Sequence, residues 1–304
     1  MACKRADPSP SGAGNRFGIS WRNRTSLADA GSHRLPGQPF PNLSGIEASI
    51  CSSDPGTIPT TTRTCVGVWA YIENADLSGA ELSEADLSGA IISKTKLINV
   101  RLMRTNMTEV SMTDVDLTQA DLSEAKLSYA RMRGARLLGA QFVNSDLTKA
   151  SLDEADLSYA DLDGARLVNA DLTGANLKGA HMHRVNALET DMGWANLVNC
   201  HLSDGLFLWT FLSGSNMSGS DLSNSDFSRA TMMRSVLRGA DMHNVSVVYS
   251  DLTEADLSDA DLSGSKLINA NLHGSNLRGA KLNKVCMIDS DLQGRLVRGF
   301  LDRH

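Results

Sequence analysis

Residues 75–89 read ADLSGAELSEADLSG, and this five-residue pattern decides the fold of the chain. It continues without a change of register from Ala70 to Gly294, through 45 consecutive units. One position of each unit (72, 77, 82 and so on) is nearly always large and apolar, most often Leu. The position two residues before it is nearly always small, and the remaining positions are mostly polar.

This period excludes a long helix and a long strand. In a helix five residues advance about 500°, so successive Leu positions would lie about 140° apart and form no stripe. In a strand an odd period places successive Leu side chains on opposite faces. A short extended segment followed by a turn fits, because the small and large residues then point inward and the frequent Gly at the last position suits the turn. Each unit is therefore predicted to be one side of a coil.

The outward-facing charges indicate how many sides a coil has. With four sides, residues 20 apart stack at about 4.8 Å. Opposite charges across such a ladder are favourable, and every twentieth residue gives a column of alternating sign: Asp76, Lys96, Asp116, Arg136, Asp156. Three sides would instead stack Asp76 on Ile91. The core agrees with four sides, because the small exception Ala187 is followed 20 residues later by the large Phe207. The sequence thus predicts an all-β, four-sided parallel β-helix of about 11 coils.

The run of A(D/N)LXX units resembles the pentapeptide-repeat proteins over residues 70–294. The resemblance implies a right-handed quadrilateral β-helix, and it implies a protein that is not an enzyme. It also implies an alternative function, because the best-understood members are dimers that mimic duplex DNA, bind gyrase and protect it from quinolones.

The chain divides into three predicted parts: 1–69, 70–294 and 295–304. All seven prolines lie before residue 60, and residues 1–69 are rich in Ser, Thr, Gly and Pro, which predicts a disordered, low-complexity segment. An organelle transit peptide and an overlong gene start are the alternatives. Residues 295–304 are predicted to form a short cap that places Leu296, Val297, Phe300 and Leu301 over the last coil.

Composition and motifs point away from catalysis and from a bound cofactor. The sequence holds no GxGxxG, Walker, HExxH or GxSxG motif. The five cysteines are far apart and odd in number, which fits a reducing compartment. With neither a secretory signal nor a long apolar run, the expected location is the cytoplasm, without membrane insertion. Small-molecule substrates and nucleic acid are not expected as partners.

The charge balance fits DNA mimicry poorly. Residues 70–304 carry 31 acidic and 22 basic residues, a net charge of −9, whereas duplex DNA of the same length, about 53 Å, carries roughly 31 negative charges. A third possibility is metal binding, because His181 and His201 are 20 apart, His183 lies beside them, and Asp161 and Asp221 flank the column. The alternative is a set of solvated surface residues.

One outward column changes from polar to apolar halfway along the chain. It follows the central residue on the fourth side, and the apolar residues that it holds or adjoins are Val168, Leu188, Leu206, Leu208, Trp209, Val248, Tyr249, Ile268 and Ile288. Exposed apolar strips with aromatic residues are typical of contact surfaces. The sequence therefore predicts a scaffold that binds another protein or a second copy of itself. The alternatives are that a loop or the N-terminal segment covers the strip, or that β-branched residues merely favour the sheet.

Overall fold

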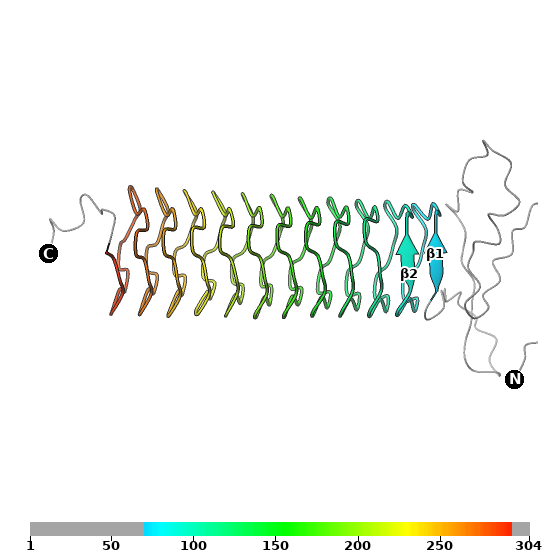
Figure 1. Ribbon diagram of the computed structural model, residues 1–304, viewed down its shortest axis with the longest axis horizontal. Coiled ribbons are helices and arrows are strands. Elements are labelled where there is room, and N and C mark those ends of the chain that lie inside the picture. The colour runs from blue at the N-terminus through cyan, green and yellow to red at the C-terminus, as the bar shows by residue number, and fades with distance from the viewer. Residues whose placement is uncertain (1–69, 294–304) are drawn as a thin grey trace, which may run out of the picture.

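The computed structural model describes residues 70–293, which form a rod of stacked laps of chain (Figure 1). Strand β1 (Tyr71–Glu73) pairs in parallel with β2 (Ile91–Ser93), with Tyr71 opposite Ile91. Isolated parallel bridges continue this pairing along the rod, and each joins residues 20 apart, from Asp76 and Lys96 to Asn271 and Asp291. Four five-residue units therefore make one lap, as the charge columns predicted.

The four units of a lap define four sides, which we name A to D in the order that the chain visits them. Side A begins with residues 70–74, side B with 75–79, side C with 80–84 and side D with 85–89, and each side recurs every 20 residues. Residues 70–293 contain no helix, and hence none that could cross a membrane. The predicted disordered segment 1–69 and the predicted cap 295–304 lie outside the described residues.

The corners between sides share one backbone conformation. Every fifth residue from Asn74 to Asp289 has a positive φ, whether or not it is Gly. The turn is closed by bonds such as the one that the Ala80 N–H donates to the Leu77 carbonyl oxygen (3.0 Å), which is the pattern of a type II turn. The expectation that this position favours Gly was incomplete, since Trp194 holds the same conformation with φ 60°. Its N–H donates to the carbonyl of Ser213 on the next lap (3.0 Å), so pairing between laps holds the conformation.

Gly at a corner also makes room for the side chain one lap earlier. A Cβ built on Gly214 would lie 2.5 Å from the Trp194 ring, and one built on Gly179 would lie 2.8 Å from the ring of Tyr159. The corner side chains of Trp194 and Tyr159 thus lie over the backbone of the following lap. At these two positions Gly is favoured by the ring of the preceding lap, since other residues hold the same positive φ elsewhere.

The core is the column of large residues and the column of small residues, both buried along nearly the whole rod. Phe207 is fully buried and its ring stacks on that of Phe227, with centroids 4.5 Å apart and an interplanar angle of 3°. Gly205 makes this possible, because a Cβ there would overlap the Phe207 ring and lie 3.1 Å from the Leu202 carbonyl oxygen. That Phe207 fills a void above Ala187 stays a prediction.

The outward-facing Asp of the repeat forms a hydrogen bond with the backbone of its own turn. Asp76 Oδ1 accepts the Ser78 backbone N–H (3.1 Å), and Asp261 Oδ1 accepts that of Ser263 (3.0 Å). Such Asx bonds hold the backbone at the start of each turn. The abundance of Asp therefore reflects turn formation.

We expect the rod to lose stability in acid for the same reason. Hydrogen bonds from the Ser263 side chain and from Lys281 lower the pKa of Asp261 to about 2, from 3.8 in the free side chain. Bonds from Ser78 likewise lower the pKa of Asp76. A pKa that is lower in the folded state stabilises the fold above about pH 4, and this contribution disappears as the pH falls toward about 2.

Urea unfolding followed by circular dichroism should therefore give a constant midpoint between pH 7 and pH 5 and a falling midpoint below about pH 4. Asp261→Asn keeps an acceptor for the Asx bond but cannot titrate, so its midpoint should fall less steeply. A wild-type midpoint that stays constant down to pH 2.5 would contradict this account.

Candidate protein-contact surface on side D

All nine residues of the predicted apolar strip lie outside the core. We call them the side D strip: Val168, Leu188, Leu206, Leu208, Trp209, Val248, Tyr249, Ile268 and Ile288. Four are exposed, with Trp209 at 48% and Tyr249 at 59%, and the other five are half-buried. Backbone hydrogen bonds join the successive laps that carry the strip. One example is the bond that the Glu189 N–H donates to the Leu208 carbonyl oxygen (3.0 Å). Ser228 interrupts the column. The outward position expected for these side chains is therefore correct.

The strongest feature of the strip is a stack of three side chains at the corner between sides D and A. The Arg229 guanidinium carbon lies 4.7 Å from the centroid of the Trp209 ring and 5.4 Å from that of Tyr249. The cation is thus held between two aromatic rings, one on the lap before and one on the lap after. Sequence reasoning named both rings and missed Arg229, although the spacing of 20 residues from each ring contains the signal.

The apolar surface continues around this corner onto side A. Phe211, two residues after Trp209, is 52% exposed, and Met233 is exposed on the next lap. Thr210 between Trp209 and Phe211 is buried and donates its hydroxyl to the Ala187 carbonyl (3.0 Å). That anchor fixes the backbone from which both aromatic side chains project. Sequence reasoning missed Phe211 because it followed one side at a time.

Carboxylates that form no ion pair within residues 70–293 surround this apolar surface. Some charges elsewhere on the rod pair between laps, as in Arg104 with Glu84 (3.1 Å). Four acids border the surface: Glu189 in the corner column below Trp209, Asp191 bridged to Phe211, Asp226 bridged to Leu206, and Asp251 in the column of Phe211. None of the four forms an ion pair with another residue between 70 and 293.

Side C carries four of the five histidines among residues 70–293 and an acidic column of limited length. The rings of His181 and His201 lie 4.8 Å apart and are tilted by 49°. The two residues are bridged, so their predicted placement one above the other on one face is confirmed. His183 instead directs Nδ1 toward the Ser203 hydroxyl (3.2 Å) and the Asp204 carboxylate (3.7 Å). Within residues 70–293, no three His, Cys, Asp or Glu side chains are placed to hold a metal ion. The metal alternative therefore finds no support in the geometry.

The acidic column on side C is too short to resemble the continuous charge of duplex DNA. Asp221, Asp241 and Asp261 are bridged in succession, but His201 precedes them and Lys281 follows, with its ammonium 3.0 Å from Asp261. The run of stacked carboxylates is therefore three laps long.

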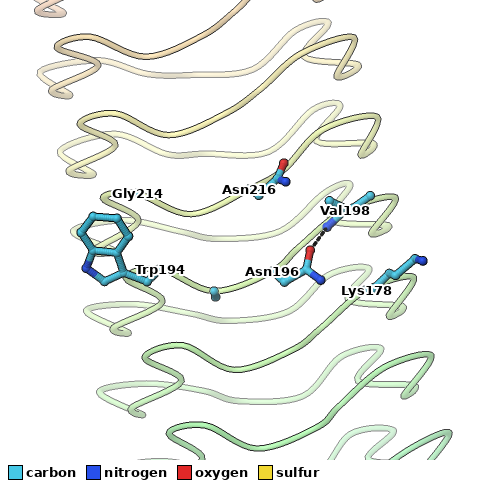
Figure 2. A pocket seen from close by; sticks show the side chains of 7 residues that line it. Lys178, Trp194, Asn196, Val198, Gly214 and Asn216 are labelled. Carbon is cyan, nitrogen blue, oxygen red and sulfur yellow. Dashed lines mark hydrogen bonds between the residues drawn. The ribbon is translucent and has the colours of Figure 1, made fainter.

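A shallow recess of about 340 Å³ lies on side B, between the Trp194 corner and the far end of that side (Figure 2). Asn196 lies in its middle and accepts the Val198 backbone N–H (3.4 Å). Among the seven lining residues the titratable group is Lys178, so the recess holds no paired acid and base. Burial raises the pKa of the nearby Cys200 thiol to about 12, which keeps it protonated at neutral pH.

The family model for pentapeptide repeats matches residues 68–102, 101–139, 135–174, 165–204, 212–247 and 255–294. The chain belongs to the pentapeptide-repeat family. The resemblance read from the A(D/N)LXX units is thereby confirmed, and the repeat protein has the β-helical solenoid architecture of its family. Proteins of this family are generally structural or non-catalytic.

Solved structures of other pentapeptide-repeat proteins are similar to this one. HetL, involved in heterocyst differentiation regulation in the cyanobacterium Nostoc sp. strain PCC 7120, is 28% identical over 70% of this chain and 87% of its own, with a TM-score of 0.27. QnrB1, a plasmid-mediated fluoroquinolone resistance protein, is 20% identical over 70% and 93%, with a TM-score of 0.28. A protein from the Arabidopsis thaliana thylakoid lumen is 29% identical over 43% and 68%, with a TM-score of 0.17. No curated protein matches the chain.

Proposed function

We propose that this pentapeptide-repeat protein is a non-enzymatic scaffold that binds another protein through the side D strip. The observation that carries the proposal is the exposed stack of Trp209, Arg229 and Tyr249. Trp, Tyr and Arg are the residue types most enriched among side chains that dominate binding energy. Because the rings already hold Arg229 in place, a partner that contacts them does not have to order that long side chain.

The proposal includes a right-handed, quadrilateral winding of about 11 laps and a length of about 53 Å. The bridges at intervals of 20 residues and the family membership support it. A rod of this kind presents the strip as a row of side chains at fixed spacing. From Val168 to Ile288 the strip covers six laps, or about 29 Å.

Substituting the strip should weaken binding strongly without unfolding the rod. We expect Leu188→Asp, Leu208→Asp and Ile268→Asp, combined in one chain, to weaken partner capture at least tenfold, because each places a charge where the partner would bury apolar area. Affinity capture from the native cell with quantitative mass spectrometry, alongside light scattering for the oligomeric state, measures this.

A matched control removes other exposed aromatic side chains: Tyr159→Ala with Trp194→Ala, both at corners away from side D. This control should bind as the wild type does. If the triple variant keeps both its captured partners and its oligomeric state, the strip is not the binding surface.

A further inference from the structure

We propose that residues 15–24 of this same chain cover the side D strip, and that this intramolecular contact competes with the partner. The inference rests on the function proposed above, since it concerns regulation of the same strip. The occupant is identified by the chemistry of the surface, by the composition of the segment and by the length of chain that connects them.

The side D strip and its acidic border are complementary to a segment with apolar residues in the middle and basic residues at both ends. Its centre consists of the Trp209 and Tyr249 rings with Phe211 beside them, all exposed. Arg229, the cation at this centre, already makes cation–π contacts with both rings. Four bordering acids, Glu189, Asp191, Asp226 and Asp251, have no cationic partner within residues 70–293. Apolar side chains flanked by arginines would bury the centre and pair with the border.

Residues 15–24, NRFGISWRNR, have this composition. Phe17, Ile19 and Trp21 alternate with small residues, so an extended backbone presents all three on one face. Arg16 and Arg22 lie directly outside this apolar set, followed by Arg24, and residues 8–28 contain no acidic residue. Phe17 and Trp21 would be about 13 Å apart in an extended chain, against about 10 Å for the two laps between Trp209 and Tyr249. The segment and the exposed stack therefore match in length.

The connection between the segment and the rod has the length that the contact needs. Ala70 is about seven laps from Trp209, or about 33 Å, and about nine laps from Tyr249, or about 43 Å. Residues 25–69 supply 45 residues. A random coil of that length has a root-mean-square span of about 37 Å. Because a tethered ligand is most concentrated where its span matches the distance to the site, we expect an effective concentration on the order of 1 mM.

The contact would lower the apparent affinity for a partner. If the segment alone bound the strip with a dissociation constant of about 100 µM, an effective concentration of about 1 mM would leave roughly a tenth of the molecules uncovered. A partner that needs the uncovered state would then bind roughly tenfold more weakly. The pairing of arginines with exposed carboxylates would make the cover sensitive to salt.

Residue-resolved hydroxyl-radical labelling of the full-length chain tests this. The comparison is the wild type against a full-length variant with Phe17→Asp, Ile19→Asp and Trp21→Asp, at low protein concentration. We expect labelling of Trp209, Phe211 and Tyr249 to rise roughly tenfold in the variant, whereas Trp194, which is 71% exposed on a different corner, should label equally in both. A second variant, Arg16→Glu with Arg22→Glu, should raise labelling of the same three residues.

Equal labelling of Trp209 in wild type and variant would overturn the inference and leave the proposed function intact. Protection that persists in the variant and grows with protein concentration would also overturn it, because a second copy would then cover the strip. Loss of protection in the variant with Phe17, Ile19 and Trp21 replaced supports the inference. If neither the wild type nor this variant captures a partner protein, that result counts against the proposed function and leaves the inference standing.

Discussion

Phe207→Ala should destabilise the rod by about 3–5 kcal/mol, the usual cost of truncating a fully buried Phe. Phe207 lies one lap after Ala187, which is the small exception in the column of large residues. Truncation would therefore place two Ala on consecutive laps and remove the ring that stacks on Phe227. Neighbouring laps in a solenoid contact only each other, so the damage should centre on residues 185–230.

Urea unfolding and native-state amide exchange measure this effect. The matched control is Phe142→Ala, a truncation of an equally buried Phe that holds the same large position of its unit on side C. Since Phe142 has no stacked ring partner among residues 70–293, we expect it to cost less than Phe207→Ala by about 0.5–1.5 kcal/mol. Two equal losses of stability, or exchange that accelerates evenly along the rod, would show that the Phe pair has no special role.

Gly205→Ala should cost about 2–3 kcal/mol through overpacking. Ala is the commonest residue in the small column, so the change restores the consensus of the repeat and would be expected to be harmless from sequence alone. In the structure, however, the new methyl group would overlap the Phe207 ring and approach the Leu202 carbonyl.

A second substitution, at Phe207, should restore part of the stability that Gly205→Ala removes. Gly205→Ala combined with Phe207→Leu should be more stable than Gly205→Ala alone, because Leu does not occupy the space of the ring. Gly239→Ala is the control, since a Cβ there meets no atom within 4 Å and reports only the strain of its positive φ. Additive free energies of unfolding for the Gly205 and Phe207 changes would contradict the proposed overlap.

Much of the fold could be predicted because the pattern is periodic. Asp76 and Lys96 are bridged as their alternating charges predicted, and the apolar column of side D faces outward. With five residues in a unit and 20 in a lap, the position of a residue in the sequence determines which side it lies on and whether it points inward or outward. Once the register of the repeat is known, every residue in it can be assigned in this way. The outward column could thus be found by reading every twentieth residue.

The parts that were missed depend on contacts between columns or on backbone conformation. Phe211 belongs to side A, and its proximity to Trp209 appears once the corner is seen as one surface. Arg229 lies between two rings, a contact that involves three laps and is not visible in one five-residue unit. The positive φ of Trp194 contradicts local preference and is held by pairing with the next lap, which no local pattern reveals.

The distance between nitroxide labels at positions 169 and 289 tests the 20-residue lap most directly. Asn169 and Asp289 are exposed residues of the same corner column, 120 residues apart. Six laps predict a separation of about 29 Å by double electron–electron resonance, whereas laps of 15 residues would place the labels eight laps and about 38 Å apart. A single distribution near the shorter distance is the result expected here, and one near the longer distance would contradict both the four-sided lap and the side D strip that depends on it.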